Sequence, residues 1–158
     1  MRPLAEILKE IFNDAELNFQ YAEEQNLFSL CIKTENTDVS LILKCDDAIQ
    51  MIYCYADFPI KIPKVKQLEI IRAINRINYN YAHATFALDE SDGQLLAKSS
   101  MNTDDGAVNC KVVFALIQSC VNLIDFYLKD LMSIVFKSDI NIFTEEYISN
   151  NKVINGLN

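Results

Sequence analysis

Glycine is scarce in this chain of 158 residues, which contains only Gly93, Gly106 and Gly156. Phosphate-cradling loops and dinucleotide-binding turns need several glycines close together, because their backbone approaches the ligand where a Cβ atom would intrude. No two of these glycines are close enough to form such a loop. The sequence therefore excludes both kinds of nucleotide site. The sequence contains a single histidine, His83, which excludes any site that needs two histidines.

Basic residues are outnumbered, with 14 Lys and Arg against 22 Asp and Glu and a formal charge of −8. Nucleic acids and anionic membranes attract proteins mainly through basic side chains. We therefore expect neither nucleic acid nor membrane as a partner. The first residues, Met-Arg-Pro-Leu-Ala-Glu, interrupt any apolar stretch with charge and show no signal-peptide pattern, which favours a cytoplasmic protein.

Cysteine provides neither a disulfide framework nor a recognisable metal motif, because the count is odd and no C-x-x-C pair occurs. The carboxylates cluster at predicted turns or helix starts, where Asp stabilises local backbone geometry. A hard cation is the alternative ligand for such clusters, but no EF-hand spacing is present. We expect no metal and no cofactor. The five cysteines, which we expect to be reduced and partly buried, are Cys31, Cys45, Cys54, Cys110 and Cys120.

Hydrophobic periodicity predicts an α+β fold, an antiparallel sheet with helices packed on one face in the order α-β-β-β-α-β-β-α. The segment 112–136 is the most apolar, but polar residues interrupt it, so we expect a buried helix rather than a membrane span. The expected helices cover residues 4–12 (ending at 13–14), 64–78 and 105–137. The expected strands cover residues 28–33, 39–45, 49–56, 81–89 and 94–101, with a further short strand at 19–22.

Residues 1–137 read as a single domain, because no repeat or linker divides them. Residues 138–158 form a polar, Asn-rich tail. The tail has an apolar group that is enough for one short docked helix and consists of Ile140, Ile142, Phe143, Tyr147 and Ile148.

The middle helix has two apolar arcs that together span roughly 220° of its circumference, about twice what packing on one sheet face requires. Ile70, Ala73, Ile74 and Ile77 form one arc, and Val65, Leu68 and Ile71 form the other. Either the long last helix or a second chain could cover the outer arc, and we favour a second chain because a small sheet has little else to cover it.

Two asparagines, three residues apart near the end of this helix, could cap the helix or bond across an interface. Asn is unfavourable inside helices because its amide competes for backbone groups, and capping is the simpler interpretation. We nevertheless expect the interface to include both. The predicted interface residues are Val65, Leu68, Ile71, Asn75 and Asn78.

Several short motifs resemble the YbjN-like family over about residues 1–137. They are the break at Ile62-Pro63, the helix end Ile74-Asn75-Arg76-Ile77-Asn78, the strand Phe86-Ala87-Leu88-Asp89 and the turn Asp92-Gly93. The family is described as bacterial sensory transduction regulators and shares the fold of type III secretion chaperones. The resemblance implies a non-enzymatic, cytosolic protein that dimerises, often through its middle helix, and binds other proteins.

A second function class stays open, a small-molecule-binding protein or weak enzyme with a pocket between the sheet and the long helix. His83 or a cysteine at the mouth of that pocket would favour it, since a thiolate nucleophile needs an adjacent base. The spacing places no cysteine beside His83. The basic run Lys61, Lys64 and Lys66 could receive an acidic partner, although a solvated edge is the simpler interpretation.

Overall fold

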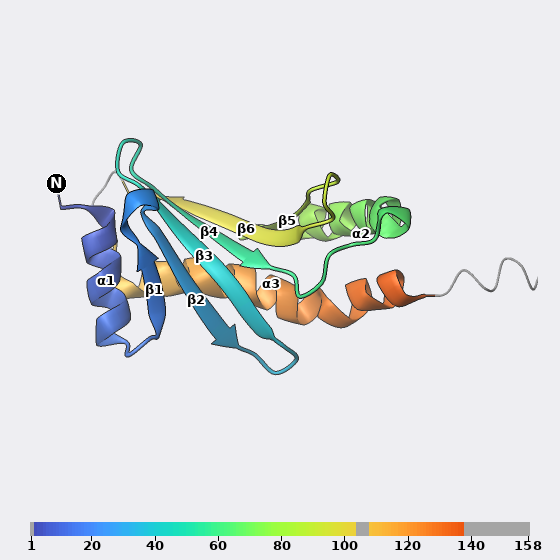
Figure 1. Cartoon of the computed structure of the whole chain (residues 1–158), viewed down its shortest axis with the longest axis horizontal. Coiled ribbons are helices and arrows are strands. Elements are labelled where there is room, and N and C mark those ends of the chain that lie inside the picture. The colour runs from blue at the N-terminus through green and yellow to red at the C-terminus, as the bar shows by residue number, and fades with distance from the viewer. Residues whose placement is uncertain (1, 104–107, 138–158) are drawn as a thin grey trace, which may run out of the picture.

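Six strands, all paired antiparallel, form a sheet in the computed structural model, which describes residues 2–103 and 108–137 (Figure 1). Their order across the sheet is β1-β2-β3-β4-β6-β5. The last strand along the chain, β6, therefore lies between β4 and β5. The strands are β1 (Phe19–Ala22), β2 (Leu27–Lys33), β3 (Asp38–Asp46), β4 (Met51–Asp57), β5 (Thr85–Leu88) and β6 (Leu95–Asn102).

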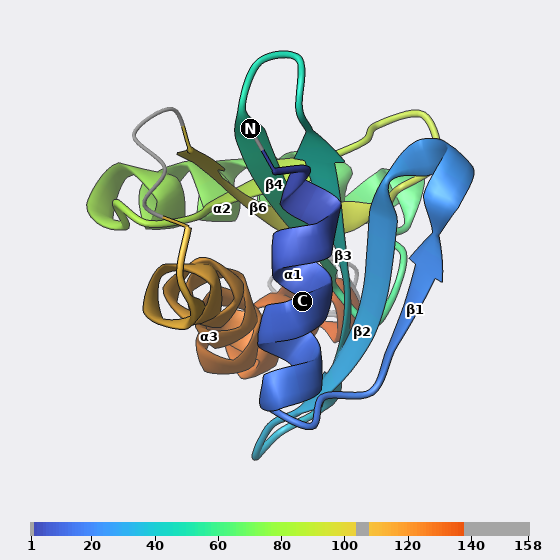
Figure 2. The same ribbon diagram turned by 90° about the vertical axis from the view of Figure 1, so that its left-hand side faces the viewer.

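Three α-helices pack on this sheet: α1 (Leu4–Asp14), α2 (Gln67–Asn80) and α3 (Cys110–Phe136). Helix α1 packs against β3, and α3 runs along β4 and β6. Figure 2 shows α1 and α3 on the same side of the sheet. Helix α2 contacts both β5 and α3, which places it at the β5 end of the sheet. The expected α+β fold is confirmed.

One face of the sheet forms the core. In β3, Val39, Leu41, Leu43 and Cys45 are buried, while the intervening Ser40, Ile42 and Lys44 are exposed. This alternation arises because successive side chains of a strand point to opposite faces. The predicted half-covered sheet is therefore confirmed, and its opposite face is open to solvent.

Helix α3 has the length and mean hydropathy of a membrane span, but it is the central core helix of the fold. The side chains of Val113, Cys120 and Leu123 are fully buried against the sheet. The helix begins at Cys110 rather than at 105. Asn109 caps it by accepting a hydrogen bond from the Val112 N–H at 3.2 Å, as a residue with non-helical backbone at this position does.

Three other predicted boundaries differ from the structure. The strand expected at 81–89 begins only at Thr85, because α2 continues to Asn80 and the chain needs four residues to turn back. Ile49 lies in a turn rather than a strand, since Gln50 adopts a left-handed φ of 51°. Four strands precede α2, one more than the expected order has, because the short β1 forms. A 3₁₀ turn, Lys64–Lys66, precedes α2.

Candidate interaction surface

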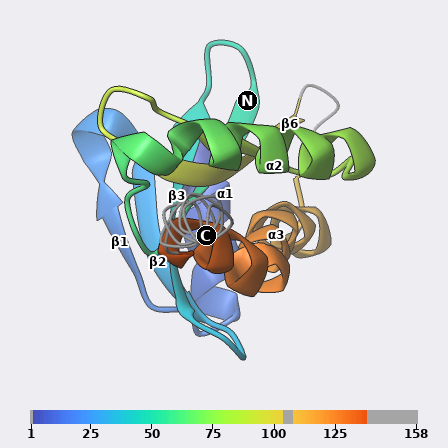
Figure 3. The ribbon, with the colours of Figure 1, turned by 90° about the vertical axis from the view of Figure 1, so that its right-hand side faces the viewer.

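The outer side of α2 exposes large apolar side chains. Val65 is 81% exposed, Leu68 59% and Tyr79 89%, and Ile71 is half-buried. The long last helix lies against the other side of α2 (Figure 3). In the part of the chain that the structure describes, α3 therefore does not cover this arc, and that alternative is wrong. Val65 belongs to the 3₁₀ turn directly before α2. We call Val65, Leu68, Ile71 and Tyr79 together the outer face of α2.

The inner arc of α2 packs into the core. Ile70 and Ile74 are buried, and Ala73 and Ile77 pack against the core while partly buried. The two arcs that the sequence predicts are therefore real, and they have different environments. Burial of the inner arc orients the helix, and this orientation leaves the outer face in solvent.

Asn75 and Asn78 have different surroundings. Asn75 is exposed. The side chain of Asn78 pairs with the backbone of β5: the Phe86 N–H donates to Asn78 Oδ1 at 2.8 Å, and Asn78 Nδ2 donates to the Phe86 carbonyl at 3.0 Å. Asn78 thereby satisfies the backbone N–H and carbonyl of Phe86 in the edge strand β5. Free backbone groups at a sheet edge would otherwise attract another strand. A role for either asparagine at an interface stays a prediction.

Replacing Asn78 with alanine should lower the free energy of unfolding by about 2 kcal/mol, because two hydrogen bonds to a partly buried backbone are lost. Asn75→Ala is the matched control, since it removes the same side chain from an exposed position and should change stability by less than about 0.5 kcal/mol. Urea unfolding followed by circular dichroism measures both. Equal effects of the two substitutions would contradict the structural role of Asn78.

The start of α2 is anchored to the turn between β5 and β6. Lys61 pairs with the carboxylate of Asp92, and Lys64 Nζ donates to the Glu90 carbonyl at 3.1 Å. Lys61 lowers the pKa of Asp92, so the stabilising effect of this pair is lost on acidification, as the pH falls through the lowered pKa. These contacts hold Val65 and Leu68 at a defined place beside the sheet.

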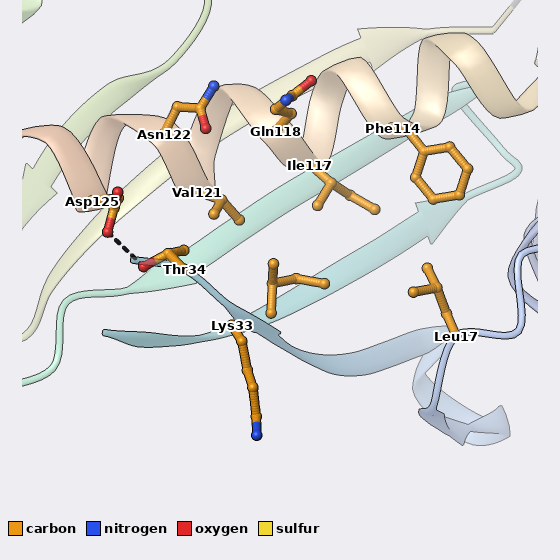
Figure 4. Close-up of a pocket in the computed structure, with 10 residues that line it drawn as sticks. Leu17, Lys33, Thr34, Phe114, Ile117, Gln118, Val121, Asn122 and Asp125 are labelled. Carbon is orange, nitrogen blue, oxygen red and sulfur yellow. Dashed lines mark hydrogen bonds between the residues drawn. The ribbon is translucent and has the colours of Figure 1, made fainter. Parts of the chain in front are cut away.

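A groove of about 460 Å³ lies between α3 and the end of β2. Figure 4 shows Lys33 pointing away from the helix and Asp125 pointing to Thr34 at the groove's rim. The hydroxyl of Thr34 and the backbone N–H of Asn36 both donate to Asp125, and the Thr34 hydrogen bond lowers the pKa of that carboxyl most. The apolar lining consists of Leu17, Ile32, Phe114, Ile117 and Val121.

This groove lies where the alternative function requires a pocket, but the side chains that would favour that function do not line it. Neither His83 nor a cysteine lines it. His83 is exposed instead, with its ring 6.5 Å from that of Tyr81. The hollows that His83 lines contain no cysteine among the described residues. The structure therefore brings no thiol and base together at this position.

Carboxylates of the acidic clusters accept hydrogen bonds from backbone groups, both within their own turn and from a distant helix start. Asp89 Oδ1 accepts hydrogen bonds from the N–H and hydroxyl of Ser91, and Asp47 Oδ1 accepts from the N–H of Leu4 at the start of α1. Residues 2–103 and 108–137 contain no group of three side chains suited to hold a metal ion. The pair at 104–105 lies outside the described residues.

Cys31 and Cys110 are exposed, whereas Cys45, Cys54 and Cys120 are buried. Burial raises the pKa of Cys45 to about 12. The pKa of Cys54 is also raised, mainly by a hydrogen bond with the Cys120 thiol and secondly by burial. The thiolate is the reactive form, and burial also closes all three thiols to a reagent. The three buried cysteines should therefore be inert in the folded protein.

Titration with a thiol-reactive disulfide reagent near neutral pH should therefore detect two cysteines in the native protein. After unfolding in urea, all five should react. Replacing Cys31 and Cys110 with serine should abolish the native reaction. A third fast-reacting thiol would contradict this assignment and would support an activated cysteine.

Comparison with known proteins matches residues 4–127 to the YbjN family, described as "Putative bacterial sensory transduction regulator". No curated protein matches the chain by sequence.

Solved structures show the same fold at low sequence identity. The ExsC–ExsE complex matches with a TM-score of 0.59 and 14% identity, covering 81% of this chain and 92% of that chain. YbjN from E. coli has a TM-score of 0.59 and 13% identity, with 88% and 93% covered. The HopA1–SchA chaperone–effector complex has a TM-score of 0.56 and 15% identity, with 77% and 90% covered. The expected type III secretion chaperone-like fold is confirmed.

Proposed function

The chain belongs to the YbjN family, and we propose that it is a non-enzymatic protein-interaction module that acts as a homodimer in the cytoplasm. Its neighbours in fold include proteins crystallised with a protein partner, which supports a regulator or chaperone-like role based on protein binding. The observation that carries the dimer is the outer face of α2, where Leu68 and Tyr79 of the helix and Val65 of the turn before it are exposed.

Apolar side chains gathered on one helix face favour a second helix, because association removes their surface from water. Leu68, Arg72, Asn75 and Tyr79 lie on one line along α2, at the three- and four-residue spacing of a helix. This line suits two-fold pairing of antiparallel helices, in which the same patch is used twice. An axis between Arg72 and Asn75 sets Leu68 against the partner's Tyr79, and Arg72 against the partner's Asn75.

The test of this proposal is the mass of the full chain in solution by light scattering. At micromolar concentration we expect the mass of two chains, twice 18.1 kDa. A mass of one chain across the micromolar range would refute the homodimer. The protein-binding role would then depend on the family and on the fold alone.

Non-enzymatic action is supported by the distribution of the reactive side chains. His83 and the two exposed thiols lie outside the groove beside α3. The groove has a volume within the range of small-molecule sites, about 300–1,000 Å³, so a bound small molecule is the competing proposal. Its lining contains neither histidine nor cysteine, which favours binding rather than catalysis there.

A further inference from the structure

Positive charge is concentrated around α2. Residues 61–80 contain five of the chain's 14 basic residues and only one of its 22 acidic residues, a net charge of +4 in a chain of −8. The five bases are Lys61, Lys64, Lys66, Arg72 and Arg76, and the acid is Glu69. A segment of opposite charge to the rest of the protein attracts acidic groups.

Two of these bases have no partner for their charge among the described residues. Lys61 pairs with Asp92, Lys64 donates to a backbone carbonyl, and Lys66 lies 3.4 Å from Glu69. Arg72 and Arg76 are exposed, and no carboxylate of the described residues lies within ion-pair distance of either. At 100° per residue, Arg72 lies between Leu68 and Tyr79 on the exposed side, and Arg76 lies beside that line.

The C-terminal tail has the complementary composition. Residues 138–158 carry three acids, Asp139, Glu145 and Glu146, and one base, Lys152. Apolar residues stand beside the two glutamates, in the sequence Ile-Phe-Thr-Glu-Glu-Tyr-Ile at 142–148. An acidic segment with apolar side chains matches a basic face with exposed apolar side chains, because charges attract within a Debye length of about 8–10 Å.

The tail also starts close enough to reach this face. Tyr127 of α3 packs against Phe86 of β5, with ring centroids 6.5 Å apart, and α2 contacts both elements. The C-terminal end of α3 lies below α2 in Figure 3. Phe143 follows the last residue of α3 by seven positions, a reach of about 23 Å when extended. A helix with its side chains is only about 10–12 Å wide. A segment of this length is therefore long enough to pass around α2 to its outer face.

We propose that residues 142–148 dock in cis on the outer face of α2, with Glu145 and Glu146 beside Arg72 and Arg76. The docked tail and a second copy of the chain then compete for one surface, so the tail regulates self-association. The competition depends on the proposed homodimer, but the docking itself does not. The groove beside α3 is the less suitable place, because the carboxylate of Asp125 stands at its rim and repels an acidic segment.

Limited chymotrypsin digestion of the full chain tests the docking. Cleavage after Phe143 and Tyr147 is followed by mass spectrometry at nanomolar protein concentration, and each rate is divided by that of the free 138–158 peptide. If the tail is docked in about nine of ten molecules, cleavage is about tenfold slower than in the peptide, because cleavage follows the undocked population. At micromolar concentration, dimer formation releases the tail and cleavage becomes faster.

Charge reversal identifies the surface. Arg72→Glu with Arg76→Glu should remove the protection, and so should Glu145→Lys with Glu146→Lys. The four substitutions together should restore it. Lys44→Glu with Lys98→Glu, on the open face of the sheet, is the matched control and should leave the protection unchanged. Cleavage as fast as in the peptide, or protection that survives reversal at Arg72 and Arg76, would overturn the proposal. The light-scattering mass tests the homodimer separately from this docking.

Discussion

Replacing Leu68 and Ile71 together with alanine should raise the dissociation constant of the homodimer by roughly a thousandfold. Each side chain truncated in a buried interface costs about 1 kcal/mol, and a two-fold dimer carries each substitution twice. The loss is therefore about 4 kcal/mol, because every 1.4 kcal/mol changes the constant tenfold. Sedimentation equilibrium over a range of concentrations measures the constant.

The monomer should remain folded, because Leu68 is exposed and Ile71 is only half-buried. Ile42→Ala with Ile49→Ala is the matched control, since it removes the same apolar volume from exposed positions away from α2. We expect this control to dimerise like the wild type. A dimer that is unchanged by the Leu68 and Ile71 substitutions would assign self-association to another surface.

Replacing Gly93 with alanine should lower the free energy of unfolding by about 3 kcal/mol, through strain in the turn between β5 and β6. Gly93 has a φ of 80°, which side chains with a Cβ atom rarely adopt. An added Cβ would also lie 2.3 Å from the carbonyl oxygen of Ile62. The chain cannot relieve this clash cheaply, because the Ile62 N–H donates to the Gly93 carbonyl at 2.7 Å.

Equilibrium unfolding in urea measures this loss of stability. Glu90→Ala changes an exposed residue of the same turn and should alter stability by less than about 0.5 kcal/mol. Because the turn anchors the segment before α2, the Gly93 variant should also weaken the homodimer. A Gly93→Ala protein as stable as the wild type would show that the approach of Ile62 does not constrain this turn.

The local pattern of the sequence was sufficient to identify each helix and strand. Strict alternation in 39–45 predicted a half-buried strand, and the spacing of Ile70, Ile74 and Ile77 predicted the inner arc of α2. These predictions succeed because the periods of helix and strand are properties of neighbouring residues. Boundaries were less predictable. The strand expected from residue 81 begins at Thr85, because the end of α2 depends on its packing against β5.

The candidate surface was predictable only in part. Two apolar arcs on one helix could be read from the spacing, but which arc is buried depends on the orientation of the helix. The pairing of Asn78 with Phe86 had no local signal, since the two residues lie on different elements. The same holds for the approach of Gly93 to Ile62.

By itself, the amino-acid sequence determined the class of fold, the two arcs of the middle helix and the excess of positive charge around it. Only the tertiary structure decided that β6 lies between β4 and β5, that Asn78 occupies the edge of β5, and that Val65 and Leu68 remain in solvent. The reason is physical: side-chain periodicity acts over a few residues, whereas the neighbours of a strand edge or a helix face come from distant parts of the chain.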